Sequence, residues 1–164
     1  MFEGMTVGQI RAEARKGAKR TLDDYWDGLF PVNPVPIARA LGASVFLAEL
    51  GDDEYGRLES DPAGANIYID RDQPLTRRTF TLAHEIGHLV SHADEPDAVF
   101  VDLRSDRGQG TASEIYANEF AGNLLMPAPE VRRLGNEGED TIAMAAYFGV
   151  SVSAMGYRRQ VLGA

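Results

Sequence analysis

The sequence predicts an α+β protein in which helices come before and after a small antiparallel sheet. Long segments with apolar residues at helical spacing occur near both ends of the chain, and short strand-like runs bounded by turn residues lie between them. The chain has 164 residues, of which 44% are hydrophobic, so a single core can be filled. We therefore expect one domain over residues 1–164, made of an N-terminal helix (1–30), a sheet with further helices (34–127) and a helical tail (139–164).

The N-terminal helix is expected over residues 6–28. Its apolar residues repeat at helical spacing and form one face: Val7, Ile10, Ala14, Ala18, Leu22, Tyr25 and Trp26. Another face is basic: Arg11, Arg15, Lys16, Lys19 and Arg20. We interpret the segment as a helix packed on one side with a solvated basic face on the other, and a docking surface is the alternative.

A short helix and three strands are expected next. The helix covers residues 35–41 and ends at Gly42. The strands cover 44–50, 55–59 and 65–70, and the turns between them contain Gly51-Asp52-Asp53 and Asp61-Pro62-Ala63-Gly64. These runs predict the small antiparallel sheet.

The tail, residues 141–162, has the spacing of a helix-turn-helix, with Gly149 in the turn. DNA binding is not the preferred interpretation, because the start of the second helix offers few side chains that read bases, and Arg158 and Arg159 come only after Gly156. The formal net charge of −9 also argues against general affinity for nucleic acid or anionic membranes.

Composition also bears on the cellular setting. The absence of cysteine excludes disulfides and thiolate metal sites. The first residues lack a basic segment followed by an apolar run, and no 18 consecutive residues are apolar. We therefore expect a cytoplasmic protein with no membrane partner.

The run His84-Glu85-Ile86-Gly87-His88 is the most informative motif. It lies in a segment, 74–92, whose apolar stripe predicts a helix anchored in the core. Residues four apart on a helix share a face, so His84 and His88 direct both imidazoles at one point, as two ligands of a zinc ion must. Glu85 is turned by about 100° and is placed to hold the zinc-bound water as a base. The structural alternative is an amphipathic helix with surface histidines.

A zinc hydrolase needs a third protein ligand. His92 lies about 12 Å along the helix from His84, too far for one ion, so we expect a helix-end, supporting or solvent-facing role for it. Asp94 matches an extended zinc motif whose turning glycine is Ser91 here. Glu114 is the preferred candidate, because it heads a face of small residues on a second helix (113–127), whereas Glu119 lies on a different face. For Glu114 the alternative is a favourable partner of the helix dipole.

The run H-E-I-G-H-L-V (84–90), followed by E-x-x-A-N-x-F-A-x-x-L-L-M-P (114–127), resembles the ImmA/IrrE family of zinc metallopeptidases. The resemblance extends over about residues 34–163. It implies a compact zincin-like fold of the minimal thermolysin type, zinc on His84, His88 and Glu114, and Glu85 as catalytic base. Tyr116 stands where the family commonly has an acidic residue.

The resemblance implies a zinc-dependent endopeptidase that cleaves a specific regulatory protein, such as a helix-turn-helix repressor or an antitoxin, in transcriptional regulation or a stress response. A zinc-stabilised binding protein that controls a partner without cleaving it is the alternative. In zincins a sheet edge near the metal holds the substrate backbone. We expect the third strand to be that edge, with Ile67 and Tyr68 as substrate-binding residues. Tyr68, Tyr147 and Tyr157 are chemically able to stabilise an oxyanion.

Overall fold

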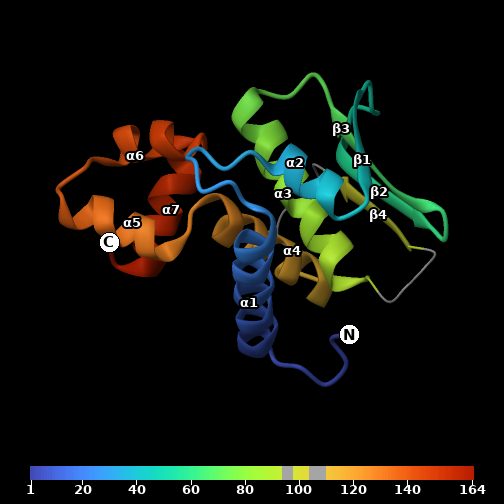
Figure 1. The fold of residues 1–164 in the computed structure, drawn as a ribbon, viewed down its shortest axis with the longest axis horizontal. Coiled ribbons are helices and arrows are strands. Elements are labelled where there is room, and N and C mark those ends of the chain that lie inside the picture. Colours follow the sequence, from blue (N-terminus) through green and yellow to red (C-terminus); the bar gives the residue numbers. More distant parts are fainter. Residues whose placement is uncertain (94–97, 104–109) are drawn as a thin grey trace.

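The helix that contains His84 and His88, α3 (Leu75–Ser91), lies at the centre of the molecule, with a sheet on one side of it and other helices on the other (Figure 1). The computed structural model describes residues 1–93, 98–103 and 110–164. The elements of the first half are α1 (Val7–Tyr25), α2 (Pro34–Ala40), β1 (Ala43–Ala48), β2 (Glu54–Asp61), β3 (Gly64–Asp70) and α3 (Leu75–Ser91). Those of the second half are β4 (Ala98–Leu103), α4 (Ala112–Leu125), α5 (Ala128–Asn136), α6 (Thr141–Phe148) and α7 (Val152–Leu162). The predicted α+β class is confirmed.

The sheet differs from the expected one in its pairing. Its strand order is β1-β3-β2-β4, and β1 runs parallel to β3, whereas β2 is antiparallel to both β3 and β4. The expectation of a purely antiparallel sheet is therefore wrong. Only the β2–β3 turn is a hairpin, in which the Asp61 carboxylate accepts hydrogen bonds from the amides of Ala63 and Gly64. Residues 49–53 connect β1 to β2, and β3 lies between these two strands in the sheet. β1 and β2 therefore pair with opposite sides of β3, and β1 runs parallel to it.

The expected edge position of β3 is also wrong. β3 pairs with β1 on one side and with β2 on the other, so neither side has free backbone groups for an added strand. Within the described part of the chain the edges are β1 and β4. β4 and α5 are elements that the sequence interpretation did not include.

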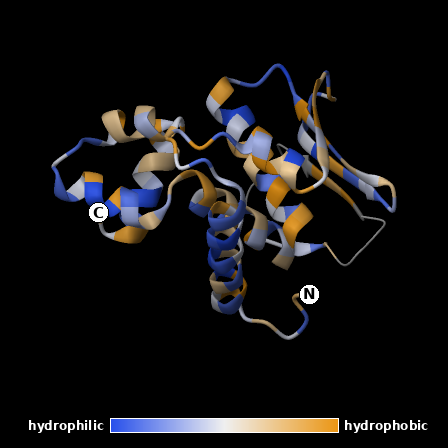
Figure 2. Ribbon diagram, in the orientation of Figure 1, coloured by the Kyte–Doolittle hydropathy of each residue, from blue (hydrophilic) through white to orange (hydrophobic). Residues whose placement is uncertain are grey.

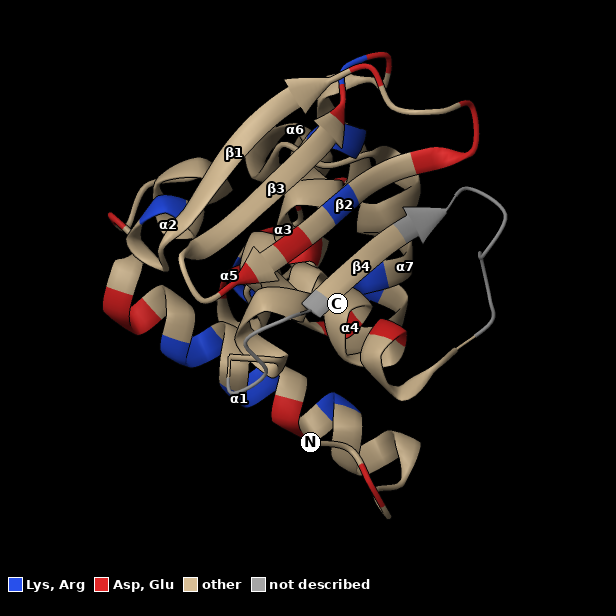
Figure 3. Ribbon diagram, turned by 90° about the vertical axis from the view of Figure 1, so that its right-hand side faces the viewer, with Lys and Arg blue, Asp and Glu red and all other residues tan. Residues whose placement is uncertain are grey.

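α1 packs with its predicted apolar face, and its buried residues include Ile10, Ala14 and Ala18; the structure shows that its partner is α4. Most of the α1 ribbon is hydrophilic (Figure 2), but basic and acidic residues alternate along it (Figure 3). Lys16 pairs with Glu13, and Arg15 pairs with Glu119 of α4 at 3.0 Å. The predicted basic face is thus largely neutralised by neighbouring carboxylates.

The tail forms two helices around Gly149, which adopts a left-handed conformation. The arginines of α7 point into the protein fold. Arg158 is buried and donates to the Met126 carbonyl and the Asn123 side chain at the end of α4, and burial lowers its pKa. Arg159 donates to the carbonyl of Ala164 and to the hydroxyl of Thr141. The helix-turn-helix spacing therefore serves packing here, and neither arginine is presented for base recognition.

The close approach of α3 and α4 depends on small residues. A Cβ atom at Gly87 would lie 2.9 Å from the Cα atom of Ala117, so only glycine allows the two backbones to come this near. A face of small residues on α4 was predicted to allow this contact, and Ala117 and Ala121 are both completely buried.

We predict that Gly87→Ala destabilises the metal-free protein by about 1–3 kcal/mol, because the added methyl group forces the two helices apart. Urea unfolding followed by circular dichroism measures the change. Gly122→Ala is the matched control. It lies in α4 with no neighbouring atom within 4 Å of a new Cβ, so alanine should stabilise the helix by about 0.5–1 kcal/mol. Equal unfolding midpoints for Gly87→Ala and wild type would contradict the packing argument.

Candidate metal centre

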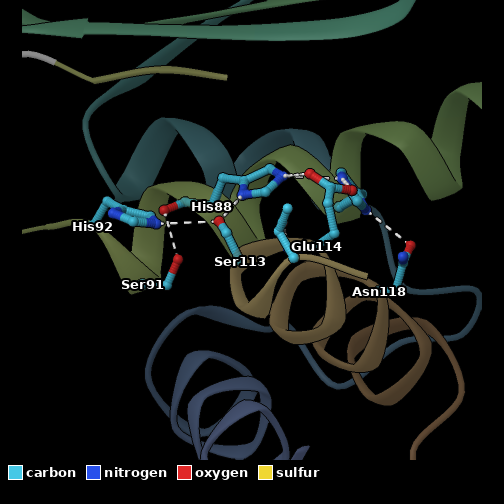
Figure 4. A network of polar contacts seen from close by, with 8 residues as sticks. His88, Ser91, His92, Ser113, Glu114 and Asn118 are labelled. Carbon is cyan, nitrogen blue, oxygen red and sulfur yellow. Dashed lines mark hydrogen bonds and ion pairs between the residues drawn. The ribbon is translucent and has the colours of Figure 1, made fainter. Parts of the chain in front are cut away.

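Three predicted ligands converge between α3 and α4. The Nε2 atoms of His84 and His88 are 3.0 Å apart, and the Glu114 carboxylate oxygens lie 3.3 Å from the first and 3.0 Å from the second. Figure 4 shows the carboxylate directed between the two rings. A tetrahedral ion with bonds of about 2.0 Å holds its ligand atoms about 3.3 Å apart. Each of the three residues offers one ligand atom, and these atoms all lie within 4.8 Å of one another, which is close enough for them to bind a single ion.

Each imidazole is oriented by a hydrogen bond to its other nitrogen. Nδ1 of His84 lies 3.0 Å from the side-chain oxygen of Asn118, and Nδ1 of His88 lies 3.0 Å from Oγ of Ser113 (Figure 4). An amide oxygen only accepts, so when Nδ1 of His84 donates to it, Nε2 carries a lone pair that can bind a metal ion. That lone pair and the Glu114 carboxylate then face the same point, as two ligands of one cation do.

The electrostatics of the pair His88 and Glu114 suit metal binding. Burial lowers the pKa of His88, and the neighbouring His84 acts in the same direction, although Glu114 opposes both. Burial favours the neutral form of Glu114, but hydrogen bonds and charges from the two histidines outweigh it and hold its pKa well below the usual range. At neutral pH His88 is neutral and Glu114 is ionised, which are the states that metal ligands need.

The Glu85 carboxylate lies against strand β2 of the sheet. It is fully buried, and its Oε1 atom lies 3.0 Å from the position that a Cβ atom of Gly56 in β2 would occupy. Gly56 therefore makes room for this carboxylate. The sequence interpretation missed Gly56, whose only signal is a glycine in the middle of a strand.

The other candidate ligands that the structure describes make other contacts. Glu119 faces α1 and accepts from Arg15 at 3.0 Å. His92 lies one turn beyond His88, with Nε2 3.2 Å from Oγ of Ser113. Asp94 lies outside the described residues. Within the described residues, the grouping of potential ligands that could hold a metal ion is His84, His88 and Glu114.

The two residues expected at the substrate, Ile67 and Tyr68, lie on opposite faces of β3. Ile67 is completely buried in the core. Side chains alternate along a strand, and Gly56, paired with Ile69, faces α3, so Tyr68 points to the opposite face of the sheet, where its ring stacks on Phe46 at 5.4 Å. The Tyr147 hydroxyl donates to Glu130 of α5. The edge position that suggested Ile67 and Tyr68 as substrate-binding residues is therefore absent.

A sheet edge does reach the ligands, but it is β4. The ring of Phe100 in β4 stacks on the imidazole of His88, with centroids 4.5 Å apart and planes 9° from parallel. Phe100 and Ser113 are neighbours of the site that the sequence interpretation missed. The alternation Val99-Phe100-Val101 and the position of Ser113 next to Glu114 were the available signals.

Tyr116, which stands where the family commonly has an acidic residue, does not contact the candidate ligands' side of α4. Its side chain is buried on the opposite side of α4, where its hydroxyl lies against Gly17 of α1. The tyrosine at this position is therefore compatible with the grouping of His84, His88 and Glu114.

Comparison with known proteins agrees with this geometry. The model of a peptidase family, described as the IrrE N-terminal-like domain, matches residues 38–159, which is 122 of the 164 residues. Among solved structures, a Mycobacterium tuberculosis transcriptional regulator has a similar fold, with a TM-score of 0.62 and 19% sequence identity. The similarity covers 93% of this chain and 50% of the regulator, so the chain spans half the length of that protein. No curated protein matches the sequence.

Among the described residues, none of the helices has the length and apolar character needed to cross a membrane. The family match includes both helices that supply the three candidate ligands. The chain therefore belongs to the peptidase family of IrrE N-terminal-like domains.

Proposed function

We propose that the protein is a zinc-dependent endopeptidase that cleaves a regulatory protein. The observation that carries the proposal is the convergence of His84, His88 and Glu114 at 3.0–3.3 Å, with Glu85 directly after the first ligand. Two imidazoles and one carboxylate are the ligand set of many catalytic zinc sites, which leave a fourth position for water. A purely structural zinc site would not require a carboxylate base beside its first ligand.

In the proposed mechanism, bound zinc supplies the acidification of a water molecule and the polarisation of the scissile carbonyl. Glu85 accepts a proton from the attacking water and later donates it to the leaving amine. Asn118 and Ser113 hold the two imidazoles in the orientation that directs their Nε2 atoms to the metal. Burial between α3 and β2 limits the exchange of the Glu85 proton with bulk water.

The substrate backbone is proposed to bind along β4 as an added strand. In the described part of the chain β4 pairs with β2 alone, and Phe100 places this edge against His88. An extended peptide on this edge would gain main-chain hydrogen bonds while its scissile bond lies beside the ligands. This proposal replaces the expectation that β3 provides the edge.

The substrate is proposed to be a regulatory protein such as a helix-turn-helix repressor or an antitoxin. The family match and the fold shared with a transcriptional regulator support a role beside gene regulation. The alternative is a zinc-stabilised protein that controls its partner by binding alone. The intact Glu85 and the space that Gly56 leaves for it favour the peptidase.

We predict that the wild-type protein holds about one zinc ion per chain and that Glu114→Ala loses it, because the site is then left with two ligands. Elemental analysis after dialysis measures the content. Glu119→Ala is the matched control, since this carboxylate of the same helix pairs with α1. Asp94→Ala tests the other candidate ligand. Full zinc content in Glu114→Ala, with folding intact, would refute the assigned ligand set.

We predict that Glu85→Gln keeps zinc and lowers the rate of peptide cleavage by about 10²–10⁴-fold, because the amide cannot accept the proton. Mass spectrometry of new protein N-termini compares cells that produce wild type with cells that produce the variant. New termini should appear only with wild type and identify the substrate. Capture of one partner by both proteins without any cleavage would instead support the binding alternative.

We predict that an uncleaved substrate peptide, bound to zinc-loaded Glu85→Gln, slows amide hydrogen exchange in residues 98–103, because added-strand binding protects edge amides. The other edge strand, residues 43–48, is the internal control and should exchange unchanged. Protection of β1 with no change in β4 would show that the substrate binds elsewhere.

A further inference from the structure

We propose that Ser113 and His92 are positioning residues for His88, and that His92 acts through the Ser113 hydroxyl to keep the Nε2 lone pair of His88 available to the metal. Oγ of Ser113 lies 3.0 Å from Nδ1 of His88 and 3.2 Å from Nε2 of His92, as Figure 4 shows. The proposal rests on the metal centre described above. It gives the third histidine of the chain a role without making it a ligand.

The need for His92 follows from the difference between an amide oxygen and a hydroxyl. Asn118 presents an oxygen that only accepts, so it fixes the proton of His84 on Nδ1 without help. Ser113 presents a hydroxyl, which both donates and accepts. A hydroxyl that donates to Nδ1 of His88 would place the ring proton on Nε2, and the ring could then bind no metal through that atom. Ser113 by itself therefore does not select the tautomer.

His92 supplies the acceptor that resolves this ambiguity. When the Ser113 hydroxyl donates to Nε2 of His92, its lone pairs remain to accept the Nδ1 proton of His88. The chain of donors then runs from His88 through Ser113 to His92. This order requires that Nε2 of His92 carries no proton and that its Nδ1 does.

Neighbouring elements hold all three groups in place. Phe100 of β4 contacts both rings, with its centroid 4.5 Å from that of His88 and 4.5 Å from that of His92. Phe2 approaches His92 edge-on at 6.1 Å. Ser113 is in the first turn of α4, where the capping hydroxyl of Thr111 accepts from the Glu114 amide. The hydrogen-bonded chain is thus fixed by α3, α4 and β4 together.

Zinc affinity of the full chain, measured by competition with a chromophoric chelator, tests the proposal. His92→Phe keeps an aromatic ring beside Phe100 and removes the acceptor, and we expect it to weaken zinc binding about tenfold. Ser113→Ala should weaken binding by about 10–100-fold. The double variant should bind no more weakly than Ser113→Ala, because His92 acts only through the hydroxyl. His92→Gln, whose side-chain oxygen can accept, should restore much of the affinity.

Ring nitrogen NMR of the zinc-loaded wild type gives a second measurement, and Nε2 of His92 should be unprotonated. A protonated Nε2, or independent and multiplicative effects of the two substitutions, would overturn the proposal. Unchanged affinity in His92→Phe would also overturn it while leaving the metal centre intact. Absence of zinc binding by wild type would overturn the metal centre and this proposal together. Urea unfolding of the metal-free variants confirms that each is folded.

Discussion

The close contact of α3 and α4 at Gly87 and Ala117 is the constraint on which the rest of the site depends. Glycine at position 87 has no side chain to meet the backbone of α4. The two helices therefore come near enough for Glu114 to reach the histidines of α3. The same approach brings Asn118 and Ser113 to the far nitrogens of the two rings. One packing contact therefore determines the position of a ligand and of two supporting residues at once.

This arrangement places electron-rich atoms against one another inside the protein. Burial keeps His88 neutral by lowering its pKa, and the histidines keep Glu114 ionised. The imidazole Nε2 atoms and the carboxylate oxygens lie 3.0–3.3 Å apart. A cation bound among them would take the place of the hydrogen bonds that the histidines make to the carboxylate.

Local signals in the sequence were sufficient to predict the grouping of His84, His88 and Glu114 that the structure brings together. His84 and His88 share a face by spacing alone, and helical phase separated Glu114 from Glu119, which the structure places against Arg15 of α1. Each of these inferences uses residues within one or two turns of a helix, where geometry is nearly fixed. The supporting residue Asn118 was identified by the same reasoning, because it lies one turn after Glu114 on the same face.

The sheet could not be predicted in the same way, because strand pairing joins residues far apart in sequence. The run at residues 65–70 was recognised as a strand, but nothing within it shows that β1 pairs beside it in parallel. That pairing depends on the path of the chain between β1 and β2. The alternation around Phe100 did contain a strand signal, which the sequence interpretation did not use. The expected edge position of β3, on which the proposal of Ile67 and Tyr68 rested, was wrong for this reason.

Phe100 connects the edge strand β4, which was not predicted, with the histidines of the predicted helix α3. It belongs to the edge strand, and its ring contacts both the ligand His88 and the supporting residue His92. A peptide that pairs with β4 would bind to the strand that packs against the two imidazoles. If the substrate binds at β4 as proposed, a shift of this strand would press Phe100 against His88 and His92, because packed side chains leave little free space. The proposed substrate edge and the orientation of a candidate metal ligand would then depend on each other.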